Sequence, residues 1–187
     1  MPEGDDWAAG WQRLQQEVGR EFDERPVTFS ADRVEAGAIR RYLEPLEFDC
    51  PLHYDRDVAI AHGYAHIVVP TSALPTFAMA PMWRPGEVLF GSDDRDAQPT
   101  STPITGILTG LEPATSGYFA TNYDVEYFDS AVVGDRLARH GAKLVACEPK
   151  ETKVGRGAFL TWQSQIVNER LDVVARLQTT FFRYKPR

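Results

Sequence analysis

The sequence lacks the cysteines, the basic excess and the long apolar runs that define several large classes of protein. Its 187 residues include only two cysteines, Cys50 and Cys147, which are not spaced as metal ligands and are too few for a disulfide scaffold. We therefore expect no metal site and a reducing, cytoplasmic setting. No segment has the apolar length of a membrane span. Residues 1–6 are acidic with no apolar run behind them, so we expect no signal peptide.

Positive charge is also scarce. The formal net charge of -7 argues against nucleic acid as the main partner, because a phosphate-binding surface needs a basic excess. One stretch of the chain is locally basic, and it contains Arg136, Arg139, His140, Lys143, Lys150, Lys153 and Arg156. Two interpretations stay open for it, contact with an anionic cofactor or the solvated face of a strand.

What the sequence does contain suits one globular domain, with 43% hydrophobic residues and enough length to bury a core. Apolar residues recur every three or four positions in residues 7–24, which predicts an amphipathic helix that Pro26 ends. The apolar residues are Trp7, Trp11, Leu14, Val18 and Phe22. Two tryptophans on one face indicate that this helix docks onto the main body.

Three further helices are predicted, over residues 31–43, 55–62 and 71–80. Asp55 and Gly63 suit the N-cap and the C-cap of the second of these. The helix over 71–80 has almost no polar face, so we expect it to be buried.

Residues 81–113 are rich in proline and glycine and carry a polar run, which predicts a long irregular loop of the kind that forms lids or binding loops. The rest of the chain changes to a period of two. Strands are predicted over 119–127 and 136–147, in a third segment after Gly157, and over 171–184. Short connections favour an antiparallel meander. Such a sheet must bury one face on the apolar helix, so the predicted fold class is α+β, a single domain whose sheet wraps that helix.

The stretch with the clearest chemistry places Asp49 and His53 on either side of Pro51. A carboxylate and an imidazole around a fixed turn can transfer protons. Alternatively, Asp49 caps the turn and His53 is a hydrogen-bonded structural residue. Asp55 is better explained as a helix cap. Cys50 adjoins His53, but no signature of a cysteine–histidine hydrolase is present, so we do not assign it as a nucleophile.

Several segments resemble the MaoC-like acyl dehydratases and (R)-specific enoyl-CoA hydratases, most closely the N-terminal-type dehydratase subfamily. Residues 126–137, EYFDSAVVGDRL, resemble the family's EY…PV…GD.L segment. Residues 51–70 resemble its PLH.D…A…GY…I…P region, and DVVA at 172–175 also fits. The resemblance implies a hotdog domain over 27–187, preceded by an N-terminal helix in 1–26 and elaborated by the loop 81–113.

The resemblance also implies site residues. In the family an aspartate five positions before a histidine forms the acid–base pair, and His53 takes the histidine position. Phe48 stands where the aspartate is expected, Asp49 lies one position later, and Cys50 replaces an asparagine. The implied catalytic residues are thus His53 and Asp49. By the same resemblance Gly63 and Tyr64 bind the substrate, a backbone amide there serving as oxyanion donor.

Three functions follow from the resemblance. The first is hydration or dehydration of an acyl thioester of coenzyme A or acyl carrier protein, which enters as substrate, so that no separate cofactor is expected. The second is a non-catalytic subunit that binds the acyl chain while a MaoC-like partner supplies the acid–base pair. The third is an acyl-CoA thioesterase, since hotdog folds also host that chemistry. The expected assembly is a homodimer or a heterodimer with another hotdog subunit.

Overall fold

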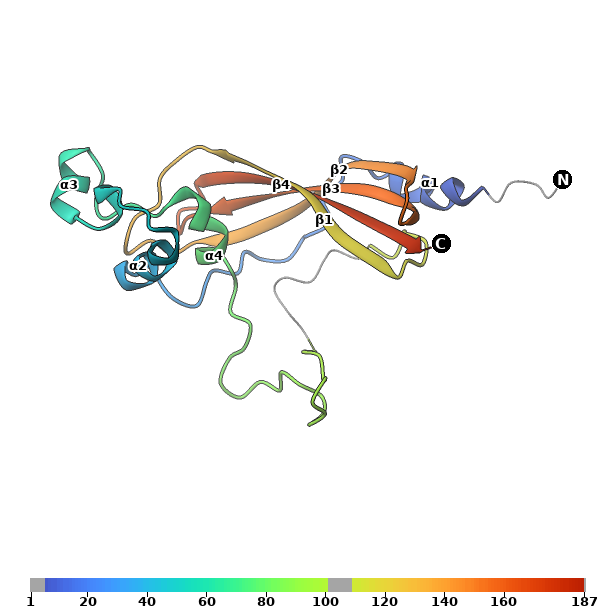
Figure 1. The fold of residues 1–187 in the computed structure, drawn as a ribbon, viewed down its shortest axis with the longest axis horizontal. Helices are drawn as coiled ribbons and strands as arrows, with labels where there is room; N and C mark the ends of the chain where they lie inside the picture. The colour runs from blue at the N-terminus through green and yellow to red at the C-terminus, as the bar shows by residue number, and fades with distance from the viewer. Residues whose placement is uncertain (1–5, 101–108, 187) are drawn as a thin grey trace.

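Four long antiparallel strands form the body of the structure, a computed structural model that describes residues 6–100 and 109–186. The strands are β1 (Gly117–Tyr127), β2 (Ala138–Glu151), β3 (Gly155–Val167) and β4 (Val173–Pro186). Their order in the sheet is β1-β4-β3-β2 (Figure 1). The predicted meander is therefore confirmed for β2, β3 and β4.

The prediction is wrong for β1, which pairs with β4 instead of with β2. A hairpin needs a short connection, whereas residues 128–137 form a longer one with contacts of its own. Within it, Val132 forms an isolated bridge with Val68, and Val133 donates a hydrogen bond to Ile67. These contacts hold the connection against the segment before the apolar helix, so β1 and β2 end on opposite edges of the sheet.

The alternation of side chains decides which face of the sheet is buried. Leu160, Trp162 and Ile166 of β3 point to one face, which we call the inner face, and all three are buried. Between β3 and β4 the chain makes a tight turn, one of the short connections that the sequence predicts. The side chain of Asn168 accepts hydrogen bonds from the amides of Arg170 and Asp172 there.

The helices are shorter than their apolar patterns predict. They are η1 (Trp7–Trp11), α1 (Gln12–Gln15), α2 (Ala36–Leu43), η2 (Glu44–Leu46), η3 (Pro51–His53), α3 (Arg56–Ala61), η4 (Thr71–Ala73) and α4 (Leu74–Phe77), where η marks a 3₁₀ helix. None of the helices in residues 6–100 and 109–186 is long and apolar enough to cross a membrane.

The first predicted helix, 7–24, ends early because its second half turns toward the sheet edge. Gly19 has φ +100, a conformation that favours glycine, and its amide donates to the Leu144 carbonyl. Phe22 then bonds to Ala142, so this segment runs beside β2. The apolar helix 71–80 is likewise only η4 and α4. Its burial is confirmed for one face only, where Ala73, Leu74 and Ala78 are at most 1% exposed, whereas Thr71, Ser72, Thr76 and Met79 are exposed.

Two apolar clusters cover the inner face. The first, the helix-side cluster, joins α2 and α4 to β3 and β4 and includes Ile39, Leu43, Leu74, Leu137, Ile166 and Leu177. The second, the N-terminal cluster, packs the N-terminal segment on the other half of the sheet and includes Trp11, Leu14, Leu144, Leu160 and Trp162. Figure 1 shows α2, α3 and α4 at one end of the sheet and α1 at the other. The division of the chain at residue 26 stays a prediction.

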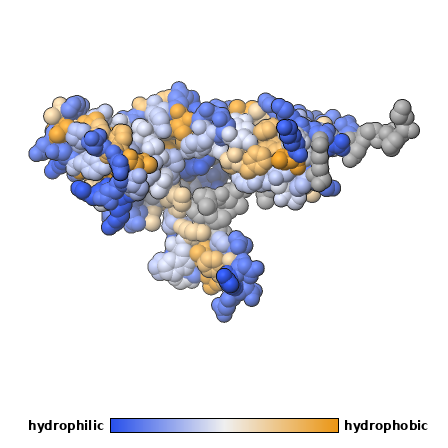
Figure 2. Space-filling view, viewed as in Figure 1, coloured by the Kyte–Doolittle hydropathy of each residue, from blue (hydrophilic) through white to orange (hydrophobic). Residues whose placement is uncertain are grey.

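Residues 79–100 leave α4 as an arm that stands off the body (Figures 1 and 2). The Trp83 indole N–H donates to the Glu87 carbonyl, and Phe90 forms an isolated bridge with Pro99. Neither a helix nor a longer strand occurs in residues 81–100, as the irregular loop prediction requires. Residues 101–108 of that predicted loop lie outside the described residues.

One buried hydroxyl gives a stability prediction. Thr179 is 6% exposed, and its Oγ1 is the only buried side-chain N or O atom in the described chain without a hydrogen-bond partner. Replacing an unpaired buried hydroxyl with a methyl group of the same shape removes a desolvation cost. We expect Thr179→Val to raise the free energy of unfolding by about 1 kcal/mol in urea titrations. A loss of stability would show that the hydroxyl has a partner.

A second stability prediction concerns Glu112, which accepts hydrogen bonds from the Thr109 hydroxyl and from the amides of Thr109 and Leu111. Partial burial raises the pKa of Glu112, but these hydrogen bonds outweigh it and hold the pKa below its usual value of 4.5. A lowered pKa contributes stability that is present above the unfolded pKa and is lost as pH falls through the folded one.

We therefore expect Glu112→Gln to cost about 1 kcal/mol in urea unfolding at pH 7. The difference from the unsubstituted chain should shrink as the pH falls below 4.5. An equal difference at pH 7 and pH 3 would contradict this assignment of the stabilisation to the ionised carboxylate.

Candidate functional site

The predicted catalytic stretch folds as a short, well-braced turn. Pro51 opens the helix η3, where a missing amide hydrogen costs nothing, and the His53 amide donates to the Cys50 carbonyl at 3.1 Å. The hydroxyl of Tyr54 donates to the Phe48 carbonyl at 2.7 Å, which closes the turn from the other side. The backbone around His53 is thus fixed by local hydrogen bonds.

The ring of His53 is oriented by a contact with the segment before the apolar helix. Its Nδ1 lies 2.8 Å from the Val68 carbonyl oxygen, and the Val68 amide donates to the Leu52 carbonyl at 3.0 Å. A carbonyl only accepts, so Nδ1 carries the proton. In the neutral ring Nε2 is then unprotonated and can accept a proton. A general base needs this tautomer.

The Asp49 side chain does not bond to the His53 ring in the described structure. The carboxylate of Asp49 is exposed and makes no hydrogen bond or ion pair with His53 or with any other residue that the structure describes. The ring beside His53 is instead that of Phe48, with 5.6 Å between the ring centroids. The one-residue displacement seen in the sequence therefore corresponds to two side chains that share no hydrogen bond or ion pair. Their catalytic roles stay predictions.

Gly63 and Tyr64 belong to the C-terminal end of α3. The Gly63 amide donates to the Ile60 carbonyl at 2.9 Å, and the Tyr64 amide donates to the Ala59 carbonyl at 3.1 Å. Gly63 has φ +90, as a glycine that ends a helix commonly does. Both amides are thus used within the helix cap. The oxyanion role suggested for them stays a prediction and requires this cap to open.

At the other end of α3, Asp55 is the N-cap that the sequence predicts. Its carboxylate accepts hydrogen bonds from the amides of Asp57 and Val58, at 2.8 and 3.2 Å. Asp55 is therefore engaged in holding the helix.

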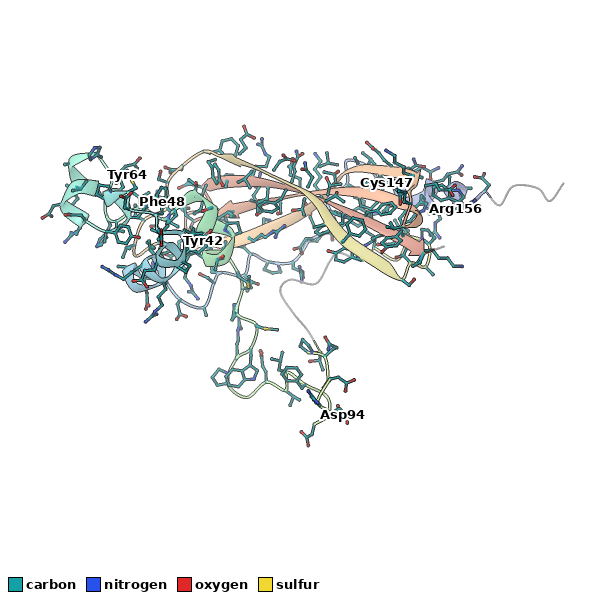
Figure 3. All side chains as sticks on the ribbon, in the orientation of Figure 1. Tyr42, Phe48, Tyr64, Asp94, Cys147 and Arg156 are labelled. Atoms are coloured by element: carbon teal, nitrogen blue, oxygen red, sulfur yellow. The ribbon has the colours of Figure 1, made fainter. Side chains whose placement is uncertain are left out.

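Tyr42 and Phe48 lie together with Tyr64 at the helical end of the molecule, far from Cys147 and Arg156 (Figure 3). The Tyr42 hydroxyl donates to Ser72 Oγ at 3.1 Å, which links α2 to the start of η4. Neither this contact nor the Val68 carbonyl that orients His53 was found from the sequence, because both join segments separated by an unpredictable loop path.

The isolated chain has a groove near this site but not at it. The groove has a volume of about 270 Å³ and is lined by residues from 30–38 and from the end of α4, including Arg33, Phe77 and Met79. Neither His53 nor Asp49 lines it. At its rim, the Arg33 guanidinium bonds to Glu169 at 2.6 Å and lowers the pKa of that carboxyl.

Outside this site, we considered the Cys147 thiol as a nucleophile and clusters of acidic, histidine and cysteine side chains as metal ligands. Burial raises the pKa of the Cys147 thiol to about 11, so it is protonated at neutral pH. Among the described residues, no group of three or more histidine, cysteine, aspartate or glutamate side chains is arranged to hold a metal ion.

Comparison with known proteins places this geometry in a family. Residues 16–177 match the family model described as "FAS1-like, dehydratase domain region". The chain is 25% identical over 178 residues to a probable enoyl-CoA hydratase alpha subunit from Thermomonospora curvata. That alignment covers 94% of this chain and 52% of the relative, so the chain spans about half the length of the relative.

Solved structures agree on the fold. A chain of the ChsH1-ChsH2 complex from Mycobacterium tuberculosis is similar with a TM-score of 0.67 at 20% identity, and 97% of each chain is covered. A MaoC-like dehydratase from Rhodospirillum rubrum is similar with a TM-score of 0.56 at 22% identity, over 91% of this chain and 94% of that one. The α+β hotdog fold is thereby confirmed. The chain belongs to the FAS1-like dehydratase domain region family, and its fold is the one seen in the MaoC-like hotdog structure.

Proposed function

We propose that this chain is the acyl-thioester-binding subunit of a hotdog hydratase or dehydratase, and that a second hotdog subunit supplies the acid–base pair. The observation that carries the proposal is the environment of His53. Its neighbours are the Phe48 ring and the Val68 carbonyl, while Asp49 is exposed and unbonded to any described residue. The chain has the family's fold and one half of the expected pair.

The reaction needs more than one oriented histidine. Adding water to an α,β-unsaturated thioester requires a base for the water, an acid for the α-carbon and donors for the enolate-like oxygen. His53 can act as one of these groups. No carboxylate among the described residues bonds to it, and the amides of Gly63 and Tyr64 are occupied. This incompleteness favours catalysis with a partner's residues.

The edge of the sheet supports a partner of the same fold. β1 is an edge strand that pairs on one side only, with β4. Its Tyr118, Phe119, Tyr123 and Tyr127 are 41% to 48% exposed. An open edge with exposed aromatic side chains favours strand pairing with another chain. The ChsH1-ChsH2 neighbour is itself a complex, and the Thermomonospora relative is named as one subunit.

The substrate in this proposal is an acyl group held as a thioester to coenzyme A or acyl carrier protein. The carrier is part of the substrate, and no separate cofactor is proposed.

A second candidate is a self-sufficient hydratase that uses His53 with Asp49. The fixed position of Nδ1 favours it, because Nε2 is left as a proton acceptor. In that case Asp49 must turn toward His53 when substrate binds. The third hypothesis, a thioesterase, gains no supporting contact among the described residues.

The test is enoyl-CoA hydration by the purified chain, alone and mixed with a separately purified hotdog subunit that carries an intact aspartate–histidine pair. Activity only in the mixture supports the binding subunit. Activity of the chain alone that falls with Asp49→Asn supports the second candidate.

A further inference from the structure

The inner face of the sheet becomes polar between its two apolar clusters. Ser164 of β3 and Thr179 of β4 are 5% and 6% exposed, and they are buried polar residues on neighbouring strands. Along its own strand, each of these two residues has a member of the helix-side cluster two positions away on one side. Two positions away on the other side lies a residue that belongs to the N-terminal cluster or packs against it. We call this region, with Arg139 of β2 and Tyr123 of β1, the polar band.

Arg139 is the cation of the band. Its Nε donates to Ser164 Oγ at 2.9 Å, and its backbone amide donates to the Ala78 carbonyl at 3.0 Å. It forms no ion pair with any residue that the structure describes. The bond from Nε leaves the outer N–H groups of the guanidinium, a planar fork that suits a carboxylate.

The Arg139 guanidinium points from the β2 edge toward the middle of the sheet. Burial raises the pKa values of Tyr118 and Tyr123 on β1, and the positive charge of Arg139 acts on both tyrosines in the opposite direction. β2 is an edge strand and β3 is its neighbour in the sheet, so the bond to Ser164 shows that the Arg139 side chain extends inward over β3.

The band also holds a polar atom that has no partner. Thr179 pairs directly with Tyr123 across the β1–β4 ladder, and its Oγ1 is buried without a hydrogen bond among the described residues. Buried hydroxyls are ordinarily bonded, so an exception needs an explanation. A ligand oxygen or a water held in the band would supply the missing partner.

We propose that the polar band binds a carboxylate at the far end of the acyl group, with Arg139 as its main partner. This rests on the proposed function, since the thioester end is assigned to the His53 turn. The helices η4 and α4 connect the two places, because Val68 contacts His53 before them and Ala78 contacts Arg139 after them. Their length is on the order of 10 Å. An acyl chain that runs beside α4 thus brings its far end to Arg139.

The test is calorimetric binding of saturated acyl-CoAs, which do not undergo hydration, to the full chain. Dicarboxylic acyl-CoAs of four, six and eight carbons are compared with monocarboxylic acyl-CoAs of the same lengths. At one length, we expect the terminal carboxylate to tighten binding about tenfold. Arg139→Gln should abolish that preference and leave the affinity for the monocarboxylic partner within about twofold. Arg176→Gln is the matched control, because Arg176 pairs with the exposed Glu126 instead.

The outcomes separate this proposal from the proposed function. If monocarboxylic acyl-CoAs bind and dicarboxylic ones bind no better at any length, the carboxylate site is overturned while the acyl-binding function stands. A preference that survives Arg139→Gln also overturns it. If no acyl-CoA binds, the proposed function fails, and free suberate then tests the band alone. Suberate binding that is lost in Arg139→Gln supports the carboxylate site, and its absence overturns it.

Discussion

The isolated chain should hydrate an enoyl-CoA at least about 100-fold more slowly than the same chain assembled with a hotdog subunit that carries an aspartate–histidine pair. General acid–base catalysis by positioned groups contributes roughly 10²- to 10⁴-fold. The isolated chain presents one such group, His53, without a bonded carboxylate among the described residues. The difference is measured as initial rates at equal chain concentration.

Substitutions in the assembled protein locate the pair. Because the exposed Asp49 carboxylate forms no hydrogen bond or ion pair with His53 or any other described residue, Asp49→Asn should change turnover by less than about threefold. Asp55→Asn is a suitable control, since Asp55 caps α3 through hydrogen bonds that an asparagine side-chain oxygen can also accept. A loss of 100-fold or more in Asp49→Asn alone would contradict the partner-supplied pair.

Trp11→Ala should cost about 3–5 kcal/mol of the free energy of unfolding. Trp11 is 2% exposed and lies in the N-terminal cluster with Leu144 and Trp162. Its removal leaves a cavity beneath the N-terminal segment, on a half of the sheet that α4 does not reach. Urea unfolding followed by circular dichroism measures the change.

Trp83→Ala is the matched control for this prediction. Trp83 is the same residue type on the arm, but it is 48% exposed and outside both clusters. Its substitution should change stability by less than about 1 kcal/mol. If Trp11→Ala were equally mild, the N-terminal segment would be an appendage and not part of the core.

The sheet was largely predictable because its signal is local. Alternation along β3 places Leu160, Trp162 and Ile166 on one face, and that face is buried. Strand order was less accessible. The sequence of residues 128–137 does not predict that β1 pairs with β4. That pairing depends on contacts between residues far apart in the chain, such as Val132 with Val68.

Helix ends show a similar limit. The apolar spacing of residues 7–24 continues past Gln15, but backbone hydrogen bonds from Gly19 and Phe22 to β2 replace the helix there. An apolar side chain at helical spacing serves either structure. The periodicity therefore predicts the buried face of the segment better than its backbone conformation.

The candidate site was predicted in part. Residue types and spacing led to His53 and to the displaced Asp49, and Asp55 was correctly interpreted as a helix cap. The contact between Phe48 and His53 was not foreseen, since ring packing depends on the path of the turn. Arg139 appeared only as one member of a basic stretch. Its position on the inner face follows from the sheet register and from its bond to Ser164.

The proposed function requires that Asp49 and His53 of this chain do not form a working acid–base pair. Its most direct test is the initial rate of trans-2-octenoyl-CoA hydration by the isolated chain, beside the Asp49→Asn and His53→Ala variants. We expect no turnover above the protein-free background in any of the three. Turnover by the unsubstituted chain that disappears in both variants would contradict the claim.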